Sequence, residues 1–150
     1  MKRIASIAVL AGLTFAAGAA LAHDDAYLDT QKAPNGGQLR MAGPNHYELV
    51  LVKDAKEVRE NPVVVYVTDH AGQKIPTAGA AGTATILAGK LKAAATLKPD
   101  GDNRMKGVAK YASTPDTKVV VSITLAGKQA EQARFTPLAV AKDTHTDHKH

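Results

Sequence analysis

The stretch Lys118-Val-Val-Val-Ser-Ile-Thr-Leu125 decides the fold class of this chain. Apolar side chains recur there at every second position, and they are Val119, Val121, Ile123 and Leu125. A period of two is typical of an extended strand, because successive side chains of a strand point to opposite faces. We therefore predict a β-strand that packs one face on a core, with Val121 and Ile123 both in that core.

The same alternation appears in two further segments, Leu91–Leu97 and Met105–Tyr111. Other strands are predicted at Gln38–Met41, His46–Val52, Val63–Thr68, Thr83–Leu87 and Gln129–Thr136, the last with Ala133 and Phe135 pointing inward. Clusters of Gly, Pro, Asn and Asp separate these segments and are typical of turns. Seven to eight short strands at near-regular spacing predict an all-β chain, folded as an immunoglobulin-like (Ig-like) antiparallel β-sandwich.

Two segments lack the strand pattern. Asp24–Lys32 is polar and has no clear period. Lys53–Asn61 is rich in helix formers, and its Lys-before-Glu pairs four residues apart give weak support to a helix. Pro62 follows and stops any helix. We expect Lys53–Asn61 to be a charged excursion between two antiparallel strands, with room for one helical turn.

The first 22 residues have the three parts of a secretory signal peptide. Lys2 and Arg3 form the charged region, Ile4–Ala20 is apolar, and Ala20-Leu21-Ala22 is a small-residue cleavage site. We expect cleavage before His23 and export to the periplasm. No second apolar stretch of membrane-spanning length follows, so no membrane insertion is expected after cleavage. The predicted organisation is a signal peptide at 1–22, a β-sandwich domain at 23–137 and a disordered tail at 138–150.

The composition of the 150 residues excludes several classes of protein. There is no Cys, which rules out disulfides, thiolate catalysis and Cys-ligated metal centres. The formal charge is +5, but the Lys residues are scattered and aromatic residues are few, so no nucleic-acid partner is expected. The sequence has no hydrolase, phosphate-loop or zinc-protease motif, and we predict that the chain is not an enzyme.

The tail Asp143-Thr-His145-Thr-Asp-His148-Lys-His150 is the most distinctive string for chemistry. A short His-rich tract is a metal-binding signal by composition, and imidazole suits copper, zinc and nickel. His145, His148 and His150 are therefore candidate ligands of a divalent metal ion. The alternative is a solvated terminus that happens to contain His.

His23 becomes a chelating residue if cleavage falls after Ala22. It would then offer an α-amine and an imidazole from one residue, and a second His would complete a copper site. His46 begins a predicted strand and is the candidate for that second ligand, although it is equally suited to a rim position at a sheet edge. His70 lies in Asp69-His-Ala-Gly72, where a role in the turn is the stronger interpretation.

Three motifs resemble a module of small periplasmic proteins. They are Ala33-Pro-Asn-Gly-Gly-Gln38, His46-Tyr-Glu-Leu-Val50 and Val65-Tyr-Val-Thr-Asp-His-Ala-Gly-Gln-Lys74. The module is also similar to one near the N-terminus of adaptor subunits of heavy-metal efflux pumps, and the similarity extends from about Lys32 to Pro137. It implies a β-sandwich and a link to copper, zinc, cobalt or nickel. Such modules often read Ala-Pro-His-Gly-Gly, and here Asn35 replaces that His.

Two functions follow from these patterns. The first is a periplasmic metal-binding protein, a buffer or shuttle for copper (or zinc, nickel or cobalt) linked to metal resistance, with His23, His46, His145, His148 and His150 as ligands. The alternative is a non-catalytic Ig-like module that docks on a periplasmic efflux or envelope protein and whose histidines are incidental. An N-terminal His on an Ig-like fold also resembles periplasmic copper proteins of that architecture.

Overall fold

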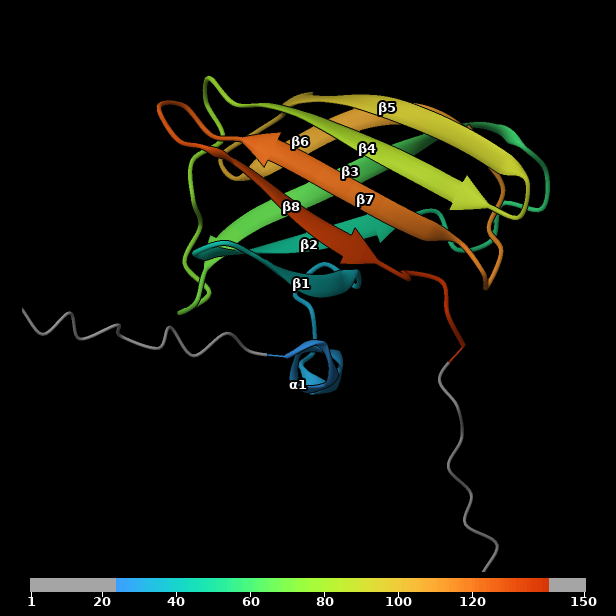
Figure 1. Ribbon diagram of the computed structural model, residues 1–150, viewed down its shortest axis with the longest axis horizontal. Coiled ribbons are helices and arrows are strands. Elements are labelled where there is room, and N and C mark those ends of the chain that lie inside the picture. The colour runs from blue at the N-terminus through green and yellow to red at the C-terminus, as the bar shows by residue number, and fades with distance from the viewer. Residues whose placement is uncertain (1–23, 141–150) are drawn as a thin grey trace, which may run out of the picture.

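An eight-stranded antiparallel sheet dominates the computed structural model, which describes residues 24–140 (Figure 1). One short helix, α1 (Asp25–Thr30), precedes it. The strands are β1 (Gln38–Ala42), β2 (Asn45–Leu51), β3 (Arg59–Asp69), β4 (Ala81–Ala88), β5 (Leu91–Pro99), β6 (Arg104–Tyr111), β7 (Lys118–Thr124) and β8 (Ala130–Phe135). The all-β prediction is confirmed. In residues 24–140 no helix has the length and hydropathy that a membrane span requires.

The sheet curls into a nearly closed barrel, so the prediction of a two-sheet Ig-like sandwich is wrong. The strand order is β1-β2-β3-β6-β5-β4-β7-β8, and β1 at one end lies against β8 at the other. There the backbone N–H of Thr136 donates to Oε1 of Gln38 at 2.8 Å. A barrel forms in place of two sheets because β5 pairs with β4 along most of its length and also with β6 through Lys98 and Pro99. One strand thus joins two halves that a sandwich would keep apart.

The barrel interior holds the core, and the predicted alternation describes it well. The fully buried side chains include Leu49, Val63, Val65, Ile86, Leu97, Met105, Tyr111, Val121, Ile123 and Phe135. Val121 and Ile123 are both in this core, as predicted, and Ala133 and Phe135 of β8 point inward. Each strand therefore contributes at least one buried apolar side chain to a single core.

The segment without a clear period forms α1, which packs on β1. The side chain of Asp24 caps it by accepting a hydrogen bond from the Tyr27 N–H at 2.7 Å. Leu28 is its one buried side chain, and the Arg40 guanidinium of β1 lies 2.7 Å from the Asp29 carboxylate. A helix of six residues is too short to show a sequence period, and these contacts hold it in place.

The charged excursion after β2 contains no helix. It runs irregularly until Arg59, where β3 begins, and Pro62 lies inside that strand rather than ending a helix. The β2 ladder ends at the pair Leu51–Val63, so β3 has an open edge on that side at Pro62. Proline is tolerated at such an edge because there is no ladder hydrogen bond for it to break.

Candidate functional site

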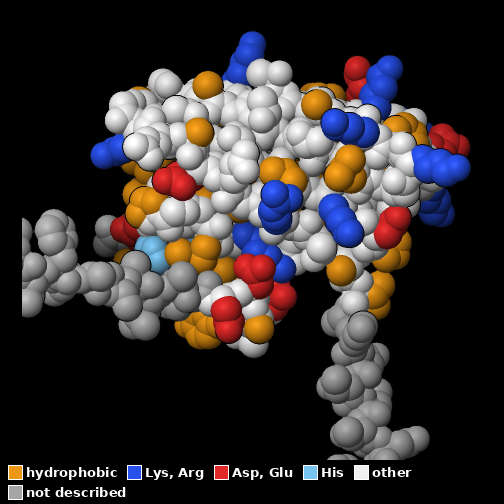
Figure 2. Space-filling model, in the orientation of Figure 1, with side chains coloured by type: hydrophobic (Ala, Val, Ile, Leu, Met, Phe, Trp, Pro, Cys, Tyr) orange, Lys and Arg blue, Asp and Glu red, His pale blue; other side chains and the backbone are white. Residues whose placement is uncertain are grey.

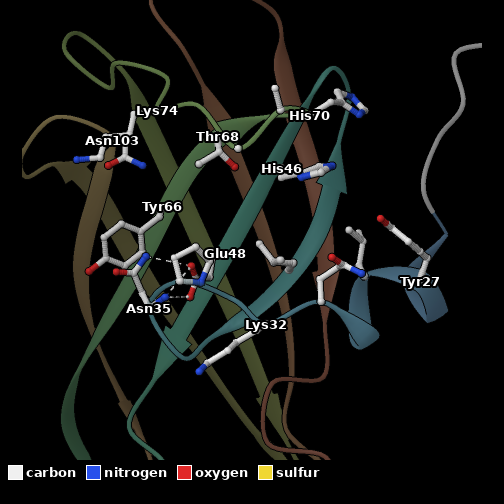
Figure 3. Close-up of a pocket in the computed structure, with 16 residues that line it drawn as sticks. Tyr27, Lys32, Asn35, His46, Glu48, Tyr66, Thr68, His70, Lys74 and Asn103 are labelled. Carbon is white, nitrogen blue, oxygen red and sulfur yellow. Dashed lines mark hydrogen bonds between the residues drawn. The ribbon is translucent and has the colours of Figure 1, made fainter.

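A cavity of about 480 Å³ lies on the outer face of β2 and β3, beneath the N-terminal segment (Figure 3). Its walls come from α1, the chain that follows α1, β1, β2, β3, the turn after β3 and the residue before β6. Both histidines of the described residues, His46 and His70, line it. The cavity is therefore the place where His46 could act as the metal ligand predicted from the sequence.

The register of β2 places His46 on the cavity side. Tyr47 and Leu49 point into the barrel core, so His46 and Glu48, which alternate with them along the strand, face outward. His46 pairs with Thr68 of β3, and Glu48 pairs with Tyr66. Although it faces outward, His46 is only 8 % exposed, because the N-terminal segment covers this part of the sheet.

His70 is brought to His46 by the turn that follows β3. The Asp69 carboxylate accepts hydrogen bonds from the N–H groups of Ala71 and Gln73, both at 2.9 Å, and Gly72 takes the left-handed φ of 79°. The turn predicted for this segment is confirmed. It also places the His70 ring 4.9 Å from the His46 ring, centroid to centroid, at an interplanar angle of 55°. His70 is exposed, so the pair has one buried and one accessible imidazole.

Glu48 anchors the other end of the cavity. Its carboxylate is 3 % exposed and accepts hydrogen bonds from Asn35 N and Gly37 N, each at 2.9 Å, and from Asn35 Nδ2 at 3.0 Å. Glu48 thus holds the Pro34–Gly37 turn. Asn35, where the resembled module has a His, serves here as a donor to this carboxylate (Figure 3).

The polar groups around the cavity are mixed in sign. Lys32 and Lys74 line it, and Tyr66 stands beside Glu48 (Figure 3). Tyr66 also forms a hydrogen bond with Arg104, and this bond is the largest cause of the raised pKa of the Arg104 guanidinium. The second cause is the charge of Asp100, whose carboxylate lies 2.9 Å from that guanidinium. On the face drawn in Figure 2, Lys and Arg side chains are scattered and a histidine lies beside hydrophobic side chains at the surface.

His23, His145, His148 and His150 lie outside the described residues, as do the signal peptide and the last ten residues of the predicted tail. Within residues 24–140 no three His, Cys, Asp or Glu side chains are grouped as a metal centre of those residue types requires. Sequence reasoning named His46 and missed its partner His70, whose turn signature concealed the contact.

Comparisons with models of protein families, with curated proteins and with solved structures found no match. The geometry offers two adjacent imidazoles at the mouth of a covered cavity, and such a pair can coordinate a transition-metal ion.

Proposed function

We propose that this chain is a periplasmic metal-binding protein, a buffer or shuttle for copper or a similar divalent ion. The observation that carries the proposal is the contact between the imidazoles of His46 and His70, 4.9 Å apart. These residues are 24 positions apart in the chain, and two separate elements bring them to one cavity. Neutral imidazole is a common ligand of copper, zinc and nickel, so both rings suit this role.

The surroundings of the pair favour reversible binding. His46 is fixed by the β2 ladder and by burial, so little conformational freedom is lost when it binds an ion. His70 is exposed on a turn and gives an ion a route from solvent. One rigid and one accessible ligand suit a protein that takes up and hands over its ion.

We keep His23 as a proposed further ligand of the same site. Asp24 accepts a hydrogen bond from the Leu28 N–H through its carbonyl oxygen at 3.1 Å, and Tyr27 and Leu28 both line the cavity. His23 is the residue before Asp24 in the chain. In a chain processed after Ala22, it would offer an amine and an imidazole to the ion.

Metal titration of processed, untagged protein tests this function. The background is the full mature chain in which His145, His148 and His150 are replaced by Gln, so that the tail does not contribute. We expect His46→Ala and His70→Ala each to lower the affinity for Cu(II) or Zn(II) by about tenfold or more, because changes around metal ligands typically cost at least that much. Gln73→Ala, on the same turn as His70, is the matched control and should bind as the parent does. Equal affinities in all four proteins would refute the proposal.

A further inference from the structure

We infer that the copper this site prefers is monovalent, Cu(I), held by the His46 and His70 imidazoles together with the thioether of Met41. The inference rests on the proposed function and narrows it to one ion and one additional ligand. Three points carry the inference. Met41 pairs with His46 across the β1–β2 hairpin, its thioether adds a sulfur ligand to the two imidazoles, and the neighbouring carboxylate of Glu48 is already hydrogen-bonded.

The hairpin between β1 and β2 places Met41 against His46. Its two-residue turn is Gly43-Pro44, in which Gly43 has the positive φ of 56° that such a turn needs at its first position. The closing pair is Ala42–Asn45, and the next pair is Met41–His46.

Along an antiparallel ladder, hydrogen-bonded residue pairs alternate with non-hydrogen-bonded pairs. The pair that closes a two-residue hairpin is hydrogen-bonded, so Met41–His46 is a non-hydrogen-bonded pair, with Cα atoms about 4.5 Å apart and side chains closest. Directly paired side chains lie on one face of the sheet, and Arg40 and Ala42, the chain neighbours of Met41, are buried on the other. The Met41 side chain therefore lies on the outer face beside His46.

A row of side chains across three strands results from this register. Met41 in β1, His46 in β2 and Thr68 in β3 are consecutive partners, and His70 follows Thr68 by two residues. His46 thus has Met41 as its cross-strand partner, and the centroid of the His70 ring lies 4.9 Å from that of His46. Methionine has three rotatable bonds after Cα, which lets its sulfur adjust to an ion held by the two rings.

The ligand chemistry favours Cu(I) over divalent ions. A thioether is a soft ligand that selects Cu(I), and two imidazoles complete a neutral set. Cu(I) and the divalent ions of copper, zinc and nickel all accept imidazole, so the thioether is the ligand that separates them. The buried carboxylate nearest in the chain, Glu48, already accepts hydrogen bonds from Asn35 and Gly37. The site thus presents nitrogen and sulfur, with this carboxylate engaged elsewhere.

Competition against a chromophoric Cu(I) chelator under anaerobic conditions tests the inference. The protein is the same full mature chain with its three tail His residues replaced by Gln. Met41→Leu keeps the volume and removes the sulfur, and Met105→Leu, at the buried methionine of β6, is the matched control. We expect Met41→Leu to weaken Cu(I) binding by about tenfold or more while Zn(II) affinity changes by less than about twofold. X-ray absorption at the copper edge should show a sulfur neighbour that Met41→Leu lacks.

The outcomes separate this inference from the proposed function. If Met41→Leu binds Cu(I) as tightly as Met105→Leu while His46→Ala and His70→Ala lose binding, the thioether ligand is refuted and the metal function stands. If Met41→Leu weakens Cu(I) and Zn(II) equally, the residue acts on the fold of the site and the preference for Cu(I) is refuted. If none of the four substitutions changes any affinity, both proposals fail. A thermal melt of each variant verifies that it is folded.

Discussion

Replacement of Glu48 by Gln should destabilise the protein strongly, although the two side chains have nearly the same shape. The Glu48 carboxylate is 3 % exposed, and both of its oxygens accept hydrogen bonds from the Pro34–Gly37 turn. In the Glu48→Gln variant one of these oxygens is replaced by an NH₂ group, which faces a donor in either orientation of the amide.

At least one donor N–H of the turn therefore loses its acceptor. With the amide oxygen facing Asn35 N and Gly37 N, the bond from the Asn35 side chain is lost and both backbone bonds weaken because their acceptor is no longer charged, so we expect a loss of about 2–4 kcal/mol in the free energy of unfolding. Loss of this anchor also loosens the segment that covers His46, so metal affinity should fall along with stability.

Urea unfolding of the metal-free protein measures the effect. With an m-value of about 2 kcal/mol per molar, the midpoint should fall by about 1–2 M at unchanged m. Glu60→Gln is the control, because Glu60 is an exposed carboxylate on β3 and its loss should change stability by less than about 0.5 kcal/mol. If Glu48→Gln is as stable as Glu60→Gln, the carboxylate does not hold the turn and the argument for a built cavity wall is wrong.

Three further predictions concern the core, the alkaline limit and processing. Ile123→Ala should cost about 2–5 kcal/mol because Ile123 is fully buried, whereas Thr124→Ala on the exposed face should cost little; equal midpoints in urea would contradict the inward assignment. Burial, and then the charge of Glu131, raises the pKa of Tyr47 to about 12, while an unfolded tyrosine ionises near about 10. The native state therefore holds more protons between these values, and stability should fall as pH rises through that window, by up to about 1.4 kcal/mol per unit; Tyr47→Phe should show a shallower slope, and the same slope in both proteins would refute the assignment. Exported protein should begin at His23, which its intact mass reports, and any other start removes the N-terminal amine from the proposed site.

Much of the secondary structure could be predicted from the sequence because alternation is a local signal. In Lys118–Leu125 and Met105–Tyr111 each inward side chain is apolar, and a strand exposes its two faces whatever partner it pairs with. The Gly, Pro, Asn and Asp residues that mark the ends of these segments are also a local signal. The core positions Val121, Ile123, Ala133 and Phe135 were accessible to such reasoning for this reason.

What only the tertiary structure decided is which segments meet. A barrel and a sandwich use the same inward faces of the strands. They differ in whether β5 pairs with β6 as well as with β4, and no local sequence pattern encodes that pairing. The site has the same origin. His46 and Met41 are adjacent because of the β1–β2 register, and His70 joins them because β3 runs back along β2 and ends in an Asp69-anchored turn. The Asp-His-Ala-Gly string is equally suited to a simple turn and to a ligand, so its meaning depends on the imidazole that long-range strand pairing places beside it.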